Sequence, residues 1–417
     1  MILLVGVSTR AMLESAVNAG FSVISLDYFA DEDAQRLSKV YSLAQDFGFE
    51  LNSYNLLKAA KLLPCTDFVY ASGPEHQPDE LYYWEERGLL RGNTPQTVKD
   101  IRNPWCLQQV LAELEISMPA FYRIEEWLSQ GKIYAGRKFL LKPLHRGGGS
   151  GIVTLPEESN TMRELLRNIS TEQYIIQAYI EGLPASVTFL ADGQEAVVLG
   201  TSRQLISMET GDFTYVGNIV PLSSLYSEKI PRFDDLLIKM VNHLTDAFKL
   251  RGLNTVDFLV STEGIHVLEV NPRWSGSVEL LERQLGLALF PYHIDPCGVA
   301  QFLKEQRDSE ENIRTKKGIT NRNNEGMIRS NNEGFWGKQI VYASEEMKLR
   351  KNLEVSSLIE QGMRDISSPG TVIKRGQPLC TVFAWAETEE DCLVSLKEKS
   401  IWAKQVLQEE QLKANLK

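Results

Sequence analysis

Several kinds of feature are scarce or missing in this chain. It has 5 cysteines in 417 residues, all far apart, and no C-x-x-C pair. A disulfide framework is therefore not expected, and reduced thiols in a cytoplasmic protein fit this pattern better. No apolar run reaches the roughly 18–20 residues that a membrane-spanning helix needs. The apolar start, Met1–Val7, has neither a basic flank nor a small-residue cleavage site, so we expect a core strand and not a signal peptide.

Basic residues are also in deficit. The chain has 44 Lys and Arg against 55 Asp and Glu, a net charge of −11 and a pI of about 5.2. Binding to nucleic acid needs clustered Lys and Arg, so no nucleic-acid partner is expected, and nothing points to a membrane partner. The remaining composition, with 43% apolar and 24% charged residues, is typical of a globular protein, and the length allows roughly two to four domains.

The N-terminal part alternates between apolar runs and helical segments. Ile2–Val7, Phe21–Leu26 and Asp67–Ala71 have the length and composition of buried strands. A helix is predicted over 8–19, between the first two strands. This alternation predicts a parallel sheet, in which ligands bind beyond the carboxyl ends of the strands. The side chains at these ends that we take as candidate substrate contacts are Ser8, Arg10 and Glu75.

The pattern changes after the first third of the chain. Helical spacing predicts helices over Pro104–Leu114 and Ile230–Phe248. The stretch 305–334 is polar and repeats Asn-Asn-Glu-Gly, so it is expected to be a linker or a long loop. Strands are predicted over Gly337–Ala343 and Thr381–Ala384. A final amphipathic helix follows, whose apolar residues face either the core or a second copy in a homodimer.

A glycine-rich segment follows a short strand. Phe139–Lys142 is apolar up to the lysine, and the residues that come shortly after it are Arg146, Gly147, Gly148, Gly149, Ser150 and Gly151. Glycine lets backbone N–H groups approach an anion closely, and the lysine ammonium can reach phosphate oxygens. The segment is neither a Walker A loop nor a G-x-G-x-x-G turn. It predicts a phosphate-binding loop, with a plain turn between strands as the alternative.

Two short strands near residue 260 carry acidic residues. If the turn between them has three residues, Thr262–Gly264, then Asp257 lies opposite Glu269. Asn271 shares the face of Glu269. Two opposed carboxylates repel each other unless a cation neutralises them, and carboxylate and amide oxygens are ligands that suit Mg²⁺. These three residues are therefore candidate metal ligands, with a solvated acidic hairpin as the alternative.

Two more segments complete the candidate site. Arg273 follows a proline beside the acidic residues, where a guanidinium can clamp a phosphoryl group or an oxyanion. Its alternative is an ordinary surface arginine. Trp274 and Ser275 come next, either facing the substrate or, for the tryptophan, joining the core. An apolar strand before Gly182 can offer a flat slot and backbone groups to a nucleotide base, through Gln177, Ala178, Tyr179, Ile180 and Glu181. Its alternative is an ordinary core strand.

In their order and spacing, these segments resemble the ATP-grasp superfamily. The matching segments are Ile2–Arg10, Phe139–Ile152, Gln177–Gly182, Asp257 and Glu269–Arg273. The resemblance implies an α/β and α+β fold, in which a parallel N-terminal domain precedes two lobes that hold ATP between them. It implies that Lys142 binds phosphate under a lid formed by 147–151, and that 177–180 contact adenine. Asp257, Glu269 and Asn271 would then hold Mg²⁺, with Mn²⁺ as an alternative, and Arg273 would act with Lys142 in catalysis.

Two positions depart from the pattern of this family. Many members have an ATP-contacting lysine near the helix start at Asn103–Trp105, and a ribose-binding acid where this chain has Leu183 and Pro184. Glu181 is the candidate replacement for that acid. The resemblance divides the chain into a parallel domain (1–100), a lobe with the glycine loop (101–182), a lobe with the metal hairpin (183–304), the linker (305–334) and a β-rich C-terminal segment that packs on the core (335–417).

The segments Gly6–Arg10, Gly337–Ala343 and Pro369–Gly370 are similar to a branch of predicted ATP-dependent carboligases related to biotin carboxylase. Its relatives include tyramine–glutamate ligases in cofactor biosynthesis of one-carbon metabolism. The resemblance implies a carboxylate–amine ligase, in which ATP phosphorylates a small carboxylic acid and an amine attacks the acyl phosphate. Two alternatives remain open. One is a carboligase that activates bicarbonate as carboxyphosphate, and the other is a nucleotide-binding regulatory protein without turnover.

Overall fold

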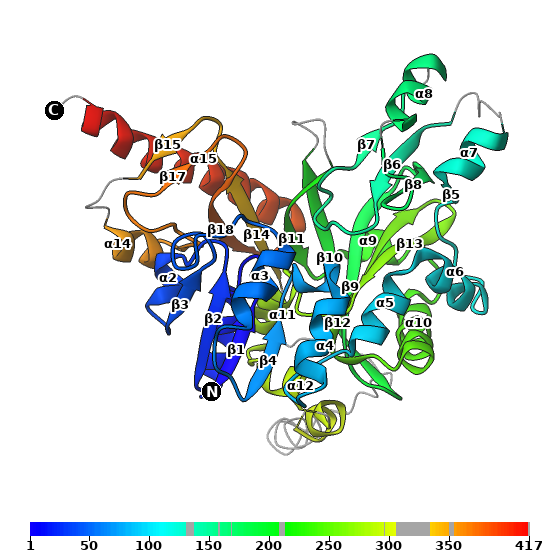
Figure 1. The fold of residues 1–417 in the computed structure, drawn as a ribbon, viewed down its shortest axis with the longest axis horizontal. Helices are drawn as coiled ribbons and strands as arrows, with labels where there is room; N and C mark the ends of the chain where they lie inside the picture. The colour runs from blue at the N-terminus through cyan, green and yellow to red at the C-terminus, as the bar shows by residue number, and fades with distance from the viewer. Residues whose placement is uncertain are drawn as a thin grey trace.

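The structure is a computed structural model that describes residues 1–130, 137–156, 159–167, 169–207, 213–295, 297–305, 334–349 and 354–415. Its N-terminal part contains a parallel sheet of four strands in the order β3–β2–β1–β4 (Figure 1). These strands are β1 (Ile2–Val5), β2 (Val23–Asp27), β3 (Val40–Ser42) and β4 (Asp67–Tyr70). Every residue of β1 and β2 is buried, as expected for strands covered on both faces. The predicted parallel sheet is confirmed.

Helices pack around this sheet and connect it to the rest of the chain. They are α1 (Arg10–Asn18), α2 (Glu32–Gln35), α3 (Ser53–Ala60), the short 3-10 helix η1 (Pro74–His76), α4 (Pro78–Glu85), α5 (Pro95–Arg102) and α6 (Pro104–Ala112). Helix α1 begins at Arg10, two residues later than predicted, because Thr9 turns back to β2. The amide and the hydroxyl of Thr9 both donate to Asp27 Oδ2, at 3.0 and 2.7 Å.

The break between α5 and α6 positions one end of the candidate site. Asn103 caps α6 by accepting hydrogen bonds from the amides of Trp105 (3.0 Å) and Cys106 (3.4 Å). Pro104 is at the start of α6, where a missing N–H costs nothing. The residue before a proline is disfavoured from helical geometry, so α5 stops at Arg102.

A small antiparallel sheet forms a lobe of its own at the upper right of Figure 1. Its strand order is β5–β8–β6–β7, with bounds Phe121–Arg123, Tyr174–Ala178, Phe139–Pro143 and Val153–Thr154. Helices α7 (Ile124–Gln130) and α8 (Ser159–Arg167) accompany it. Ile124, Trp127, Phe139 and Ile176 form its buried core. The phosphate-loop strand and the predicted hinge strand are therefore direct neighbours, β6 and β8.

A large sheet of eight strands has the order β13–β12–β9–β10–β11–β14–β18–β16. The bounds are β9 (Leu183–Asp192), β10 (Ala196–Ser207), β11 (Thr214–Val220), β12 (Arg251–Ser261), β13 (Gly264–Asn271), β14 (Phe335–Tyr342), β16 (Met363–Arg364) and β18 (Pro378–Ala386). The remaining elements are α9 (Ser224–Ser227), α10 (Phe233–Phe248), α11 (Val278–Leu285), α12 (Phe290–Ile294), β15 (Met347–Lys348), α14 (Val355–Glu360), β17 (Val372–Ile373) and α15 (Glu389–Asn415).

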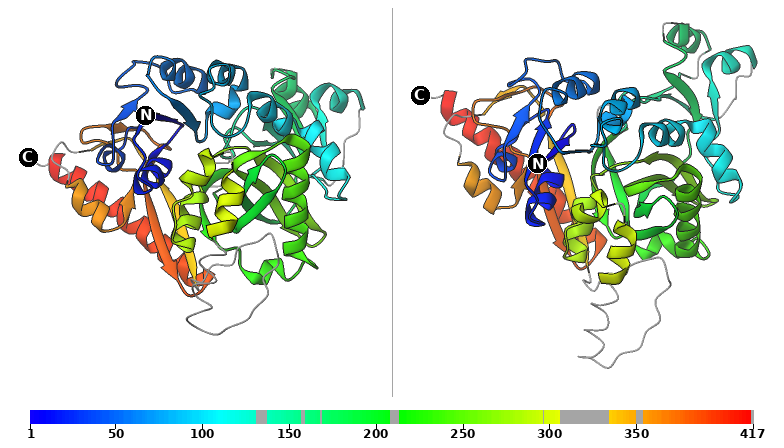
Figure 2. Two further views of the ribbon diagram at one scale, coloured as in Figure 1. Left: turned by 90° about the horizontal axis from the view of Figure 1, so that it is seen from below. Right: turned by 60° about the horizontal axis from the view of Figure 1, so that its bottom comes forward.

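The C-terminal segment is part of this large sheet. Strand β14 pairs with β11, with Gly217 opposite Gln339, and β18 pairs with β14. Helix α15 runs along β14 and β18 in both views of Figure 2, so its apolar residues Leu396, Ala403 and Leu407 join the core there. The linker predicted over 305–334 lies almost entirely outside the described residues.

The acidic hairpin has the predicted pairing but a different turn. Ser261 lies opposite Gly264, so the turn contains two residues and not three. A bulge between Asp257 and Phe258 adds one residue on the other strand, Leu268, and restores the register. Asp257 therefore lies opposite Glu269, as predicted, although the three-residue turn from which this pairing was derived is wrong.

A buried ionic cluster joins the two ends of the chain. Arg10 is 2% exposed and pairs with Glu279 at the start of α11 and with Asp365 (2.9 Å) after β16. Lys338 on β14 also reaches Glu279, at 3.4 Å. Burial alone would raise the pKa of Glu279, but the charges of Arg10 and Lys338 outweigh it and lower the pKa to about 2. The cluster therefore holds α1 against the C-terminal strands with ionised groups.

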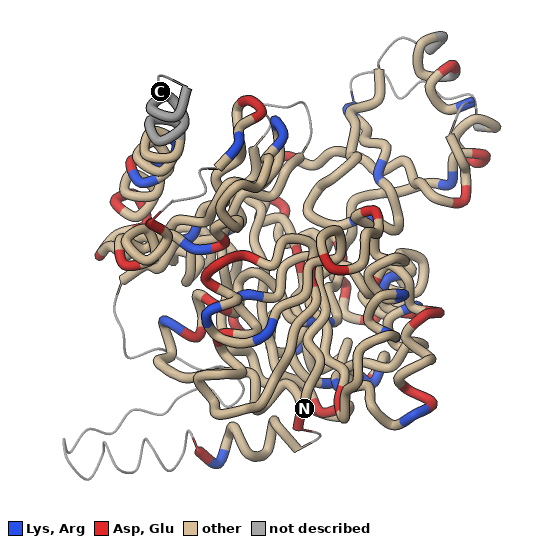
Figure 3. The backbone as a smooth tube through the Cα atoms, turned by 60° about the vertical axis from the view of Figure 1, so that its left-hand side comes forward, with Lys and Arg blue, Asp and Glu red and all other residues tan. Residues whose placement is uncertain are grey.

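Charged residues of both signs are mixed along the described chain (Figure 3). Within the described residues, no helix combines the length and apolarity needed to cross a membrane.

Candidate active site

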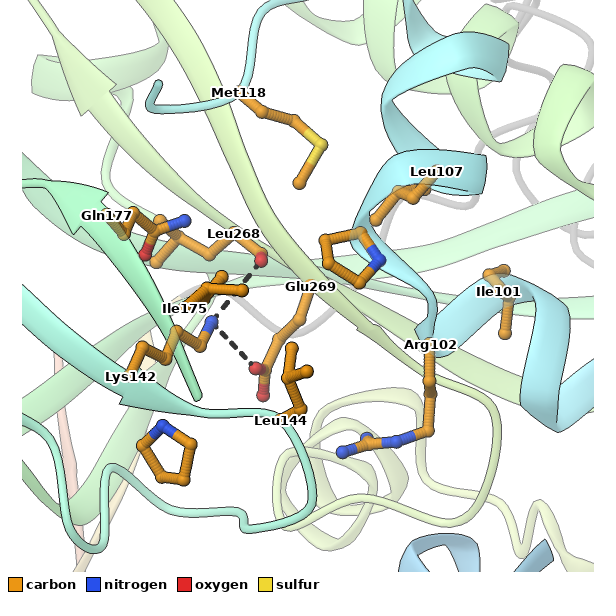
Figure 4. Close-up of a pocket in the computed structure, with 12 residues that line it drawn as sticks. Ile101, Arg102, Leu107, Met118, Lys142, Leu144, Ile175, Gln177, Leu268 and Glu269 are labelled. Carbon is orange, nitrogen blue, oxygen red and sulfur yellow. Dashed lines mark hydrogen bonds and ion pairs between the residues drawn. The ribbon is translucent and has the colours of Figure 1, made fainter. Parts of the chain in front are cut away.

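The glycine-loop strand and the acidic hairpin meet at an ion pair. Lys142 Nζ on β6 lies 3.0 Å from Glu269 Oε2 on β13. It also donates to the carbonyl oxygen of Leu268, at 3.4 Å (Figure 4). Leu268 is the extra residue of the bulge, so its carbonyl is displaced from the regular ladder. Two motifs that are far apart in the sequence thus form one site.

The candidate metal ligands lie together beside this ion pair. Asn271 Nδ2 donates to Asp257 Oδ2 (2.9 Å), and Gln204 Nε2 donates to Asp257 Oδ1 (2.8 Å). Burial, and then the charge of Glu269, raise the pKa of Asp257 to about 7. Burial alone would raise the pKa of Glu269 too, but the charge of Lys142 lowers it to about 2. Lys142 therefore balances the charge of Glu269 but leaves Asp257 short of positive charge, which is the condition that a bound divalent cation relieves.

The donor set also suits a particular kind of cation. Among the described residues, no group of three or more His, Cys, Asp and Glu side chains converges as a complete metal cage. Two carboxylates and one amide instead leave most of a coordination shell to other oxygens. Mg²⁺ is usually bound in this way, through one or two carboxylates together with water and substrate phosphates. The residues present fit Mg²⁺ on a nucleotide.

Arg273 is held beside the candidate metal ligands by three contacts. Its Nε donates to Glu75 Oε1 (2.9 Å), and its two terminal nitrogens donate to Asn271 Oδ1 (3.1 Å) and to the carbonyl of Trp274 (3.0 Å). The Glu75 side chain is fully buried. Burial alone would raise the pKa of Glu75, but the charge of Arg273 lowers it to about 2. The pair fixes the direction of the guanidinium at the end of the hairpin.

An apolar pocket opens next to Lys142. It is lined by Ile101, Arg102, Pro104, Leu107, Met118, Pro143, Leu144, Ile175, Gln177 and Leu268, together with Lys142 and Glu269 (Figure 4). A mostly apolar slot with a few polar groups is typical of a site for a planar base. Of the predicted hinge residues, Gln177 lines the pocket. The amides of Ala178 and Tyr179 donate within the protein, to the carbonyls of Ala120 (2.7 Å) and Lys138 (2.9 Å).

The glycine loop touches both the large sheet and the N-terminal part. The carbonyl of Gly148 accepts a hydrogen bond from the amide of Tyr215 on β11, at 3.0 Å. A Cβ atom on Gly149 would lie 1.6 Å from the carbonyl oxygen of Phe213, and one on Gly147 would lie 3.3 Å from His76 Nε2. Only residues without a side chain allow this close approach. Arg146 folds back over Gly151, and Ser150 lies within the same turn.

We expect Gly149→Ala to weaken ATP binding by at least ~10-fold, the loss of about 1.4 kcal/mol of loop contact. The new methyl group would collide with Phe213 and push the loop off β11. Gly148→Ala is the matched control, because Gly148 also has a positive φ (+64°, against +77° for Gly149) but its Cβ would meet nothing within 4 Å. Calorimetric titration with ATP measures both. Equal affinities for the two variants would refute the closed-loop contact.

Of the predicted substrate residues, one lies in the site and the others lie on the surface or in buried contacts. Glu75 lies in the site, bonded to Arg273. Ser8 is exposed, and Arg10 belongs to the buried ionic cluster. Trp274 is 3% exposed and packs against Phe290 and His293, so it occupies the core position that was its alternative. Ser275 is buried, with its hydroxyl bonded to Thr255 (2.7 Å) and Ser277 (2.9 Å).

Of the residues that line the pocket, the sequence predicts Lys142, Gln177 and Glu269 as site residues but not the others. Three of the others carry groups that matter to the site. Arg102 and Met118 line the pocket, and Leu268 supplies a carbonyl to Lys142. Arg102 had a usable signal, because it directly precedes the Asn103-Pro104 helix start at which a lysine was sought. No residue near Leu268 in the sequence predicts the bulge that displaces its carbonyl.

Known proteins resemble this chain in sequence. Residues 101–277 match the family model of the ATP-grasp domain. An uncharacterized protein of Methanocaldococcus jannaschii is 24% identical over 92% of this chain and 87% of its own length. The carbamoyl phosphate synthase large chain of Thermoanaerobacter pseudethanolicus is 24% identical over 53% of this chain but only 20% of its own length.

Solved structures resemble nearly the whole chain. One is the biotin carboxylase domain of Hydrogenobacter thermophilus 2-oxoglutarate carboxylase, crystallised with MgADP and bicarbonate, with a TM-score of 0.66, 16% identity, and coverage of 95% of this chain and 88% of that one. Another is the L-amino acid ligase from Bacillus licheniformis, with a TM-score of 0.65, 14% identity, and coverage of 95% and 96%. The chain therefore has the ATP-grasp fold, and residues 101–277 match the model of the ATP-grasp domain family. The predicted superfamily and fold class are confirmed.

Proposed function

We propose that this chain is an ATP-dependent ligase that joins a carboxylate to an amine through an acyl phosphate. The observation that carries the proposal is the 3.0 Å ion pair between Lys142 and Glu269. It brings the predicted phosphate-binding lysine to the predicted Mg²⁺ ligands, beside the guanidinium of Arg273, which Glu75 and Asn271 hold in place. The L-amino acid ligase, which has the same fold, supports the reaction class. A shared fold does not identify the particular acid and amine.

In this proposal the nucleotide lies between the units 101–182 and 183–304. Its base enters the apolar pocket beside Gln177 and Met118, and its phosphates lie toward Lys142 and the glycine loop. Asp257, Glu269 and Asn271 hold Mg²⁺, which when bound neutralises charge on the phosphate oxygens, and Mn²⁺ is the alternative ion. Lys142 then exchanges its contact with Glu269 for phosphate oxygens, as a flexible ammonium can.

The chemical steps rest on positioning and charge. A substrate carboxylate oxygen attacks the γ-phosphorus, and the bond to the β–γ bridging oxygen breaks to release ADP. The amine nitrogen then attacks the acyl carbon, phosphate leaves, and the nitrogen gives up a proton. Arg273 is placed to stabilise the charge that develops on the transferred group. The glycine loop, closed on β11, keeps water from hydrolysing the acyl phosphate.

A bicarbonate-dependent carboligase is the second candidate. The specific observation that favours it is the whole-chain structural match to a domain crystallised with bicarbonate. In that reaction bicarbonate replaces the carboxylic acid, and carboxyphosphate replaces the acyl phosphate. The ATP-binding half of the site is the same in both reactions.

One screen separates these candidates. Purified protein with ATP and Mg²⁺ is assayed for ADP release against a panel of amino acids, amines including tyramine, and bicarbonate. We expect ADP release to require one carboxylic acid and one amine together, with glutamate among the acids tested first. ADP release with bicarbonate and an amine alone would instead favour the carboligase. ATP binding without ADP formation across the whole panel would contradict turnover and leave a regulatory nucleotide-binding protein.

A further inference from the structure

Arg102 is a cation in the wall of the pocket. It is the last residue of α5, is partly buried and lines the pocket together with Lys142 and Glu269 (Figure 4). Lys142 and Arg273 are both paired with carboxylates, Lys142 with Glu269 at 3.0 Å and Arg273 with Glu75 at 2.9 Å. Within the described part of the chain, no carboxylate oxygen is recorded within 4.0 Å of the Arg102 guanidinium.

The neighbourhood of Arg102 is the phosphate end of the pocket. Its charge contributes to the lowered pKa of Glu269 and of Glu75, so it lies near both the metal ligands and the anchor of Arg273. It also contributes to the lowered pKa of His145, which follows the strand that carries Lys142. A partly desolvated guanidinium without a counter-ion is unfavourable, and an anionic ligand removes that cost.

The sequence at the start of α6 explains why the cation of this pocket wall comes from the end of α5. In this chain Pro104 occupies the start of α6, and Asn103 is committed to capping it. Neither side chain can bind phosphate as a cation. Arg102 is the basic residue next to them, and its longer, planar head can reach the pocket from the preceding helix.

One side chain from the N-terminal part holds Arg102. His76, in η1, accepts a hydrogen bond through Nδ1 from a terminal nitrogen of Arg102, at 3.2 Å. A guanidinium only donates, so Nδ1 must be the unprotonated ring nitrogen. Burial, with help from the charge of Arg102, lowers the pKa of His76 to about 4, which keeps the ring neutral and able to accept. The opposite edge of the ring faces Gly147 of the glycine loop.

We propose that Arg102 is a second phosphate-binding side chain of this site, and that His76 is a positioning residue that directs its guanidinium into the pocket. The ligand class is the di- or triphosphate of a nucleotide, so this inference rests on the proposed function. The adjacent Glu75 anchors Arg273 in the same manner. The short element η1 thereby fixes the direction of two arginines from outside the ATP-grasp domain.

Binding of three ligands tests the role of Arg102. Wild type, Arg102→Ala and Arg102→Lys are titrated calorimetrically with ATP, ADP and adenosine in the presence of Mg²⁺. Losing a charge-assisted hydrogen bond to phosphate should weaken ATP and ADP binding by ~10–100-fold in Arg102→Ala, while adenosine affinity stays the same. Arg102→Lys should fall between the two. Lys99→Ala is the matched control, because Lys99 is a cation on the same helix that pairs with Asp79 at the surface.

A second pair of variants tests the role of His76. His76→Ala should weaken ATP binding ~3–10-fold, because the guanidinium loses the hydrogen bond that orients it but keeps its charge. His76→Asn should restore most of this loss, because the asparagine Oδ1 takes the place of Nδ1 as the acceptor. A structural role alone would lower the melting temperature of both variants without separating their ATP affinities.

The outcomes separate this inference from the proposed function. Wild-type protein that binds no ATP would overturn the proposed function itself. Wild-type binding together with ATP affinities in Arg102→Ala equal to those in Lys99→Ala would overturn only the role of Arg102. An equal loss for adenosine and ATP would also overturn it, since that pattern indicates a damaged pocket. If Arg102→Ala fails to fold, Arg102→Gln keeps the hydrogen bond to His76 and gives the same comparison between ligands.

Discussion

Glu269→Gln should reduce ADP release by at least ~10³-fold, because it removes one of the two carboxylates that we propose as ligands of Mg²⁺ on the nucleotide phosphates. The side chain keeps its size, so the hairpin should fold as before. Its ion pair with Lys142 is partly exposed, with side-chain exposures of 16% for the lysine and 29% for the glutamate, and pairs of this kind contribute little to stability. The steady-state rate of ADP release, measured at saturating Mg²⁺, reports the loss.

The hairpin itself supplies the control for this variant. Glu263 is an exposed carboxylate in the turn of the same hairpin. Glu263→Gln makes the same chemical change and should leave the rate within about twofold of wild type. Removing the repulsion from Glu269 should also let Asp257 ionise at lower pH, since the charge of Glu269 contributes to its raised pKa. A folded Glu269→Gln variant with wild-type turnover would overturn the metal assignment.

Arg273→Lys should lower kcat by ~10²–10³-fold and leave the dissociation constant for ATP nearly unchanged. The guanidinium reaches Glu75, Asn271 and the Trp274 carbonyl at the same time. A lysine keeps the positive charge and can still neutralise Glu75, but one ammonium cannot hold this planar three-contact geometry. The charge that develops on the transferred group would then lose its fixed donor.

The choice of lysine matters for the interpretation. Arg273→Ala would leave the fully buried Glu75 carboxylate without its partner, and a buried charge stripped of its partner is strongly destabilising. Single-turnover measurements with ATP and an active acid distinguish the two effects, because a folding defect lowers the amplitude and a catalytic defect lowers the rate constant. Unchanged rate constants in Arg273→Lys would remove Arg273 from the chemical step.

The acidic hairpin illustrates what local sequence can and cannot predict. Alternating apolar and polar residues predict both strands, and burial of one face leaves the acidic residues on the other. The pairing of Asp257 with Glu269 was inferred from a three-residue turn, yet it results from a two-residue turn and a bulge. The predicted turn is one residue too long, and the unpredicted bulge adds one residue, so the two errors cancel. Bulges depend on contacts across the sheet and toward the ligand, so the sequence of one hairpin does not specify them.

Arg102 was missed for a different reason. The motif of the family specifies one residue type at the start of α6, whereas the pocket has a cation from the end of the preceding helix, α5. Its orientation depends on His76, which is 26 residues away in the sequence. Arg10 and Trp274 show the opposite case. Both stand at positions where ligand contacts are common, but their partners Asp365 and Phe290 draw them into buried contacts that only the folded chain reveals.

The continuous ladder from β13 to β18 ties the far end of the chain to the acidic hairpin. Strand β14 is joined to β11, and the ladder continues through β10 and β9 to β12. Strands that share one sheet and adjoining buried cores tend to open as one cooperative unit. Amide protons of Gly337–Val341 should therefore exchange with solvent about as slowly as those of β12, and a substitution that loosens α15 should speed exchange at both places.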